Sequence, residues 1–402
     1  MNPIAVRRAS AATFAIFALN GLVFASWAAR IPSVTRTLGL GAAEMGLLLL
    51  TIAAGSVIAL PLAGTVVARV GTAWTVRLGG FTSAMGGVLV SLGLATVSVP
   101  LTAVGLFFYG VGFGLWDVAQ NIEGADVERH LGRTIMPQYH GGFSGGAFIG
   151  ALLGAGLSTL EVGLPVHLLG ITAVVVVVMV VLPRFFLPEV GAPASGAGEP
   201  KGASAWTERR TLLVGLVVLG AALTEGAAND WIAKATVDGL GTSESAGAIM
   251  FAVFVAAMTA FRLVGGRFID SYGRVPVLLG SLAAALAGLV LFVLAPNVWL
   301  AGVGAVLWGA GAAMGFPVGM SAAADDPARA AARVSVVSTI GYVAFLAGPP
   351  LLGFLGDLVT VRWALLAIGV AIVASLLTAP AAKPLPVAVS SDGVPDGAKD
   401  LR

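Results

Sequence analysis

The chain has 402 residues, of which 58% are apolar and only 10% are Asp, Glu, Lys or Arg, with a formal net charge of +2. Soluble domains carry about 25% charged residues, and a water-soluble fold of this size could not hide so much apolar surface. The composition therefore excludes a water-soluble enzyme and indicates an integral membrane protein. Cysteine is absent, which excludes disulfides, thiolate catalysis and cysteine-based metal sites.

Stretches of about 20 apolar residues, bounded by charged or turn residues, predict an all-α polytopic protein with twelve spans. In chain order they cover 11–30, 42–67, 75–95, 99–121, 138–159, 163–187, 211–233, 246–269, 275–295, 298–322, 333–356 and 361–380. Arg7 and Arg8 before the first stretch also fit a secretory signal, but eleven further spans favour a first transmembrane helix.

The spans form two groups of six. The segment 188–210, rich in Pro, Gly, Ala and Ser, predicts a cytoplasmic linker between a six-helix bundle at 1–187 and another at 211–380. Residues 381–402 are predicted to form a disordered cytoplasmic tail.

The distribution of Lys and Arg predicts which side of the membrane each connection faces. With the N-terminus inside, 17 of these residues fall in inside connections, whereas Arg30, Arg36, Lys234 and Arg362 fall outside and Arg262 lies within a span. This asymmetry predicts that both termini are cytoplasmic, and we expect a multi-pass protein of a bacterial inner membrane.

The two halves repeat each other in the spacing of their glycines. A shift of 199 positions superposes Gly105 on Gly304, and a shift of 202 superposes Gly71 on Gly273. Two parallel six-span repeats predict a central cavity between halves that rock against each other.

The loop after the eighth span reads Gly266-Arg-Phe-Ile-Asp270-Ser-Tyr-Gly273-Arg274, and the loop after the second span reads Gly64-Thr-Val-Val-Ala68-Arg69-Val-Gly71. The first of these resembles the G-x-x-x-D-x-x-G-R loop of the major facilitator superfamily, and the resemblance covers essentially the whole chain. It implies that fold, with the glycines and charges of both loops forming a cytoplasmic latch. Arg262, one turn before Gly266, is predicted to neutralise part of this latch loop near the inner face. The second loop has Ala68 where the family usually has Asp, so the latch is expected to be asymmetric. The alternative is a pair of ordinary positively charged inside loops.

Charged side chains inside spans need a reason, because each costs about 2.5–3.5 kcal/mol at mid-membrane on insertion scales. In the fourth span, Gln120 and Asn121 share a helical face with Asp117, and His140 enters the fifth span at a similar depth. A carboxylate with amides and an imidazole can hold a proton and bind a polar solute. The run from Asp117 to Asn121 also resembles, less closely, the fourth span of fucose-type proton/sugar symporters. The alternative is that Asp117, one turn from its predicted helix end, reaches water.

The seventh span carries Glu225, Asn229 and Asp230, and the first span carries Asn20, Trp27 and Arg30 at matching heights. The resemblance implies that the first, fourth, seventh and tenth spans line the cavity, so Arg30 is predicted to pair with Glu225 or Asp230. This group is predicted to be an outer gate or proton site, and a fixed structural ion pair is the alternative. Asp230 taken alone is interpreted as an interfacial residue anchored by Trp231.

The sequence therefore predicts a secondary transporter, not an enzyme, that moves a small polar solute by alternating access with proton symport. The predicted proton-coupling residues are Asp117, Glu225, Asp230 and His140. The predicted substrate contacts are Asn20, Trp27, Arg30, Trp116, Gln120, Asn121, Asn229 and Trp308, although each tryptophan could instead be packing. The predicted latch comprises Gly64, Arg69, Gly71, Arg262, Gly266, Asp270, Gly273 and Arg274.

We expect a monomer in the lipid bilayer that has a small-molecule substrate, no nucleic-acid partner, no metal site and no cofactor beyond a proton gradient. Two alternatives stay open. A proton-driven drug or metabolite antiporter would share the fold, but the chain lacks the fourth-span Arg and fifth-span Gly-Pro pair that such proteins carry. An uncoupled uniporter or a non-transporting membrane sensor belongs to a different class.

Overall fold

The computed structural model describes residues 3–132, 135–188, 204–326 and 329–385. The predicted linker and tail lie largely outside these residues. Within them, eleven helices are long and apolar enough to cross a membrane. One of these, α3 (Ala42–Ala95), consists of two spans joined at Gly71, whose φ of 87° and ψ of 166° break the helix. The described residues therefore supply the twelve predicted spans.

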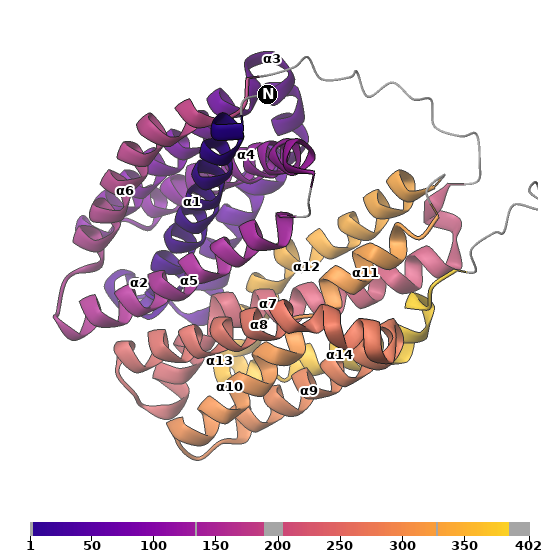
Figure 1. The fold of residues 1–402 in the computed structure, drawn as a ribbon. Helices are drawn as coiled ribbons and strands as arrows, with labels where there is room; N and C mark the ends of the chain where they lie inside the picture. The colour runs from indigo at the N-terminus through magenta and orange to yellow at the C-terminus, as the bar shows by residue number, and fades with distance from the viewer. Residues whose placement is uncertain (1–2, 133–134, 189–203, 327–328, 386–402) are drawn as a thin grey trace, which may run out of the picture.

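The helices form two groups (Figure 1). The first group contains α1 (Pro3–Ala28), α2 (Ile31–Leu38), α3, α4 (Val99–Leu131), α5 (Met136–Thr159), α6 (Leu164–Val181) and the 3-10 turn η1 (Leu182–Phe185). The second contains η2 (Ala205–Thr207), α7 (Arg209–Leu240), α8 (Glu244–Tyr272), α9 (Arg274–Leu294), α10 (Val298–Ala312), α11 (Gly315–Ala323), α12 (Ala330–Val359), α13 (Val361–Ala364), α14 (Ala367–Thr378) and η3 (Ala379–Ala382). Helices suit these uncharged runs because every backbone hydrogen bond is then made within the segment, away from water.

The predicted repeat is confirmed in the backbone. Gly71 and Gly273 adopt nearly the same conformation, with φ of 87° and 84° and ψ of 166° and 164°. The helices that follow these turns make equivalent close contacts in each group, because a Cβ on Gly86 would lie 2.6 Å from the Gly105 oxygen and one on Gly288 would lie 2.7 Å from the Gly304 oxygen. Each half is thus assembled by the same glycine-mediated helix packing.

Several helices continue well beyond the predicted spans. The helix α4 ends at Leu131 rather than near residue 121, and α7 ends at Leu240 rather than near residue 233. Asp117 is therefore fourteen residues, or about 21 Å, from its helix end, and Asp230 is about 15 Å from its own. Neither residue lies within one turn of its helix end, contrary to what the predicted span ends had implied.

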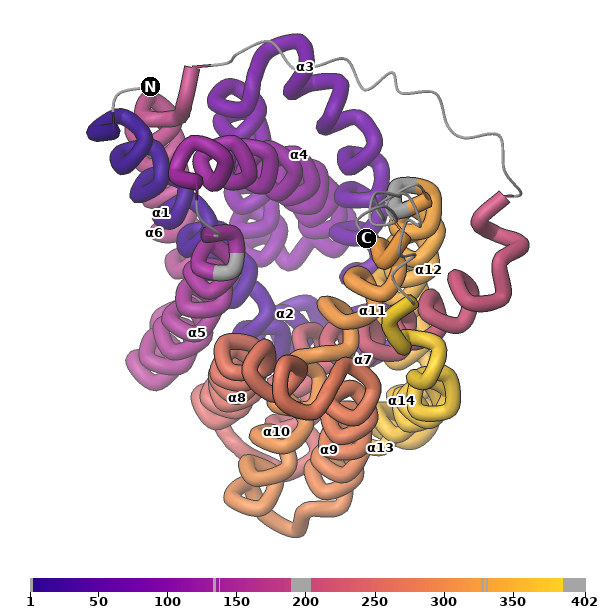
Figure 2. The backbone as a smooth tube through the Cα atoms, turned by 45° about the vertical axis from the view of Figure 1, so that its right-hand side comes forward, coloured from indigo at the N-terminus to yellow at the C-terminus, as the bar shows by residue number. Residues whose placement is uncertain are grey.

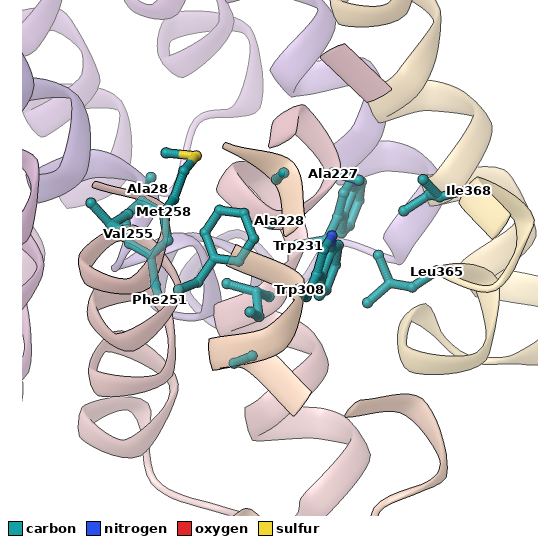
Figure 3. Close-up of a cluster of buried hydrophobic side chains, with 14 of the residues drawn as sticks. Ala28, Ala227, Ala228, Trp231, Phe251, Val255, Met258, Trp308, Leu365 and Ile368 are labelled. Carbon is teal, nitrogen blue, oxygen red and sulfur yellow. The ribbon is translucent and has the colours of Figure 1, made fainter. Parts of the chain in front are cut away.

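The two groups touch along two seams. In Figure 2, α5 lies beside α8 on one side and α3 lies beside α12 on the other. Apolar packing continues across this boundary, where Ala28 of α1 lies near Val255 and Met258 of α8 (Figure 3). The same cluster encloses Trp231 and Trp308, which have 0% exposure. Trp231 is therefore a core residue and not an interfacial anchor.

Candidate transport cavity and gate

The two groups are joined by polar contacts at one end of the molecule, where Glu244 is the centre. Its carboxylate begins α8 and is buried, with 7% of the side chain exposed. Ser33 donates a hydrogen bond to Oε2 at 2.6 Å, and Arg36 forms an ion pair with Oε1. Arg30 Nε lies 3.8 Å from the same carboxylate, and Ser158 donates to it at 3.2 Å. All four partners belong to the first group of helices.

Two further contacts close this end. Thr159 donates a hydrogen bond to Ser245 at 2.9 Å across the α5–α8 seam. Across the other seam, Asp357 at the end of α12 accepts from the backbone N–H groups of Ala42 and Ala43 at 2.7 and 3.1 Å. It thereby caps α3 of the opposite half, because Gly41 has no side chain to cap that helix itself. We call this region, containing Glu244 and Asp357, the junction end.

The opposite end, which we call the open end, has a different arrangement of charge. Asp325, just after α11, binds Arg274 at 2.9 Å and Arg210 at 2.7 Å. Glu208 likewise binds Arg333 at 2.6 Å and Arg329 at 3.0 Å. These residues all belong to the second group of helices, so the ion pairs do not cross between the halves.

The predicted latch residues other than Arg262 lie towards this open end. Arg274 contacts Asp325 and Ser321, whereas Asp270 and Arg69 are exposed. In the first half, the residue that follows the Gly71 turn is Thr72, which donates a hydrogen bond to Glu123 at 2.8 Å. The two loops therefore differ also in the residue that follows the turn glycine, which is Thr72 after Gly71 and Arg274 after Gly273.

A group of ionisable side chains lies between these ends. Asp117 accepts hydrogen bonds from Gln120 at 3.1 Å and Asn121 at 3.2 Å. It is exposed, yet it interacts electrostatically with His140 and with Tyr342 of α12. Since Tyr342 belongs to the opposite half, Asp117 faces the space between the halves.

The second half contributes an ion pair to the same region. Glu225, near the middle of α7, binds Arg262 at 2.7 Å, and Arg262 also donates to the backbone oxygen of Ala313. Arg262 lies about 15 Å before the end of α8, which is too far inside to neutralise the latch loop as predicted. The predicted pairing of Arg30 with Glu225 or Asp230 is also wrong, because Arg30 turns toward Glu244 at the junction end.

A cavity of about 230 Å³ opens between the halves. Its walls come from α1, α3, α4, α7 and α12, so the second and eleventh spans line it and the tenth does not. The lining side chains are mostly aromatic or aliphatic: Phe24, Trp27, Leu49, Ile52, Val57, Leu60, Tyr109, Phe113, Tyr342 and Phe345. Asn229 and Asp230 supply its polar surface on α7. Among the described residues, no group of three His, Asp or Glu side chains is placed to hold a metal ion.

The predicted substrate contacts are divided by this geometry. Trp27 and Asn229 line the cavity, and Asn121 is half-buried beside Asp117. Arg30 belongs to the junction instead. The remaining four are at most 1% exposed and are absent from the cavity wall: Asn20, Trp116, Gln120 and Trp308. Trp308 packs against Phe254 and Phe292 and Trp116 stacks on Phe113, so these two indole rings serve packing.

Sequence reasoning missed the junction residues and several aromatic residues of the cavity. Glu244 follows Ser243, whose hydroxyl caps α8, so from sequence it was an ordinary first-turn acid. Tyr342 and Phe345 lie on the eleventh span, which the resemblance did not place at the cavity. Asp357 did give a signal in the sequence. It is an acidic residue near the predicted end of the eleventh span, and no basic residue lies one turn away on the same helix to pair with it.

Comparisons of this chain with a family model, with related sequences and with solved structures all indicate the same protein family. Residues 216–399 match the model of the Major Facilitator Superfamily. An uncharacterised MFS-type transporter of Yersinia pestis is 32% identical over 348 residues, which cover 85% of this chain and 87% of the relative. The crystal structure of a mutant of the nucleoside transporter NupG superposes with a TM-score of 0.75 at 15% identity, covering 94% of this chain and 99% of that one. A variant of the fucose:proton symporter FucP of E. coli gives a TM-score of 0.65 at 16% identity, with 94% and 98% covered. At these identities the two structures show a shared fold.

Proposed function

The chain belongs to the major facilitator superfamily and is a secondary transporter, not an enzyme; we propose that it moves a small molecule across the membrane in exchange with, or together with, protons. The halves then rock about the central cavity, opening it to one side at a time. The positive-inside distribution supports the proposal that the open end is cytoplasmic and that the junction end faces outward.

The main support for proton coupling comes from the surroundings of Asp117. Its hydrogen bonds come from two neutral amides, and no cation is paired with it among the described residues. A carboxylate that lies within a membrane span and has no counter-charge is a candidate to carry a proton. Tyr342 of the opposite half lies within its electrostatic reach, so protonation of Asp117 alters the interaction between the halves. His140, from α5, interacts electrostatically with Asp117, which supports the proposal that the two share the proton.

Two coupling modes follow from different observations. Symport of a small polar solute is the mode predicted from the sequence, and the fold is shared with a fucose:proton symporter. Proton-driven exchange is the second candidate, and the predominantly apolar cavity wall favours it because such a wall suits a solute with an apolar body.

The test is proton movement in proteoliposomes that contain the purified protein and an internal pH dye. Pools of sugars, sugar acids, nucleosides and organic cations are added outside in turn. Internal acidification with one pool establishes symport, and alkalinisation of acid-loaded vesicles establishes exchange.

The decisive variant is Asp117→Asn, which is expected to remove net proton coupling while solute binding persists. Asp126→Asn is the matched control, because Asp126 lies on the same helix and pairs with Arg129 near its end. Full coupling in Asp117→Asn would remove Asp117 from the mechanism. If no pool changes the internal pH while a labelled solute still enters the vesicles, the protein is an uncoupled uniporter.

A further inference from the structure

The central cavity has an unusual chemical composition for a site that takes a polyol. Its aromatic walls come from both halves: Tyr109 and Phe113, 4.9 Å apart between ring centroids, on one side, and Tyr342 and Phe345, 6.5 Å apart, on the other. Its volume of about 230 Å³ is below the usual range of about 300–1,000 Å³ for ligand pockets. A small solute with an apolar body therefore fits it.

The polar groups of the cavity are few, and two of them are already engaged. The Tyr109 hydroxyl donates to the backbone oxygen of Val23 at 2.9 Å, and Ser56 donates to that of Gly110 at 3.0 Å. A polyol would lose several hydrogen bonds to water on entry and find few partners, which is unfavourable in an apolar site.

One charged group faces this cavity, and it lacks a partner. Asp230 is partly buried on α7 and makes no hydrogen bond or ion pair with any other described residue. The two ion pairs on either side of it on the same helix are complete without it: Glu225 binds Arg262 at 2.7 Å, and Lys234, one turn further on, binds Asp238 at 2.6 Å. An unpaired carboxylate in apolar surroundings is costly unless a positive charge or a proton joins it.

We propose that the cavity binds an organic cation, an amine with a positive charge on a small apolar body, with its nitrogen between the Asp230 carboxylate and the aromatic rings. The carboxylate supplies the counter-charge, and the ring faces add cation–π attraction that grows when water is excluded. Asn229, the neighbouring residue, supplies a polar contact that orients the amine. This inference rests on the proposed transport function and names the substrate class of that cavity.

The same carboxylate links binding to protons. A proton and a cation cannot both neutralise Asp230, so each cation that binds to the protonated form releases one proton from the carboxyl oxygen to water. The other titratable side chains on the cavity wall are Tyr109 and Tyr342, which are neutral near pH 7 because phenols ionise near pH 10. From the first half, Asp117 interacts electrostatically with Tyr342, and His140 interacts with Asp117. Cation binding is therefore expected to weaken as pH falls, which agrees with the exchange mode of the proposed function.

The test uses the full chain in lipid nanodiscs and benzyltrimethylammonium, a quaternary cation that cannot lose its charge or cross lipid as a neutral amine. The equilibrium binding of the labelled cation is measured at pH 8 and at pH 5. Its displacement by 2-phenylethanol and by myo-inositol, two uncharged competitors, is then measured. We expect the cation to bind more weakly at pH 5 and to be displaced by neither competitor at equal concentration.

Asp230→Asn is the decisive variant, and Asp270→Asn is its control because Asp270 is exposed near the end of α8 and is absent from the cavity wall. Asp230→Asn is expected to weaken cation binding about tenfold or more and to abolish its pH dependence. Phe113→Leu is expected to weaken binding of the cation more than that of 2-phenylethanol. Wild-type affinity in Asp230→Asn, or displacement by myo-inositol, would overturn the cation assignment.

The two proposals fail in distinguishable ways. If cation binding depends on Asp230 but no proton movement is seen in proteoliposomes, the proposed proton coupling is wrong and the proposed binding site stands. Proton-coupled flux of a different solute pool that survives Asp230→Asn would keep the transport function and remove the cation site.

Discussion

The two ends of the molecule use the same chemistry for opposite purposes. At the junction end, Glu244 gathers four partners from the other half, and Asp357 caps a helix of the other half. At the open end, Asp325 and Glu208 bind arginines of their own half. Ion pairs therefore hold the two halves together at one end and stiffen a single half at the other.

This difference indicates which contacts a transport cycle must break. If the halves rock, the bonds of Glu244, Thr159 and Asp357 have to open, because they join residues on both sides of the boundary. The pairs of Asp325 can persist throughout. Mutations at the junction end are therefore expected to change the conformational equilibrium between the halves. Mutations at the open end are expected to change the stability of one half.

The largest expected effect comes from locking the junction. The chain has no cysteine, so the double variant Thr159→Cys with Ser245→Cys carries a single possible disulfide, at a position where the native hydroxyls are 2.9 Å apart. Oxidation is expected to abolish transport, and reduction to restore it, because the two halves can then separate again. The measurement is solute flux before and after each treatment, with the disulfide verified by mass spectrometry.

Each single-cysteine variant is the control for this experiment and should transport normally under oxidant. Undiminished flux in a chain whose disulfide is fully formed would mean that the junction never opens, and the comparison between the ends would lose its functional meaning.

A smaller effect is expected from Glu244→Gln. The amide keeps the shape but removes the negative charge, which leaves the buried Arg30 without its counter-ion. The equilibrium should shift toward separation of the halves by about tenfold, equivalent to about 1.4 kcal/mol. Distances between spin labels at positions 159 and 245 would report a larger population of long separations. Glu161→Gln, an exposed acid near the same end, is the control and should leave the distances unchanged.

The turns at the open end provide a comparison in which both halves should respond alike. Gly71 and Gly273 occupy a region of φ and ψ that is essentially restricted to glycine, so alanine at either position should destabilise the protein by about 1–3 kcal/mol. Gly64→Ala is the control, because a Cβ there meets open space within a helix. Apparent melting temperatures in detergent measure the effect. A strongly unequal loss at the two glycines would show that the Arg274 and Thr72 contacts, rather than the backbone, determine the turn.

The sequence was sufficient for the fold because that fold is encoded in local properties. Uncharged runs of about 20 residues predict spans without reference to any partner, and glycine spacing predicts the repeat seen at Gly71 and Gly273. Helix ends were less predictable, since hydropathy marks the membrane core whereas α4 and α7 continue past it. That error placed Asp117 and Asp230 too near the ends of their helices.

Partner choice could not be read from the sequence, because it depends on how the halves meet. Arg30, Arg262 and Glu225 were recognised as charges that need partners, but Arg30 pairs with Glu244 and Arg262 pairs with Glu225. Nothing in the local pattern distinguishes Glu244 from an ordinary acid in the first turn of a helix. Nothing in it distinguishes the buried Trp308 from a tryptophan that lines a cavity.

The smallest expected effect concerns Glu208 at the open end. Burial disfavours its charged form, but hydrogen bonds from Arg333 and Thr211 and the nearby charges of Arg333 and Arg329 outweigh this, so the pKa of Glu208 lies below its ordinary 4.5. A depressed folded-state pKa means that the stabilisation is complete above the unfolded value and is lost as pH falls through the folded value. The melting-temperature difference between wild type and Glu208→Gln should therefore be constant from pH 8 to pH 5 and shrink in stronger acid. Label distances at positions 159 and 245 should not change in this variant, since Glu208 binds within one half. A lengthened distance would mean that the open end also governs the junction.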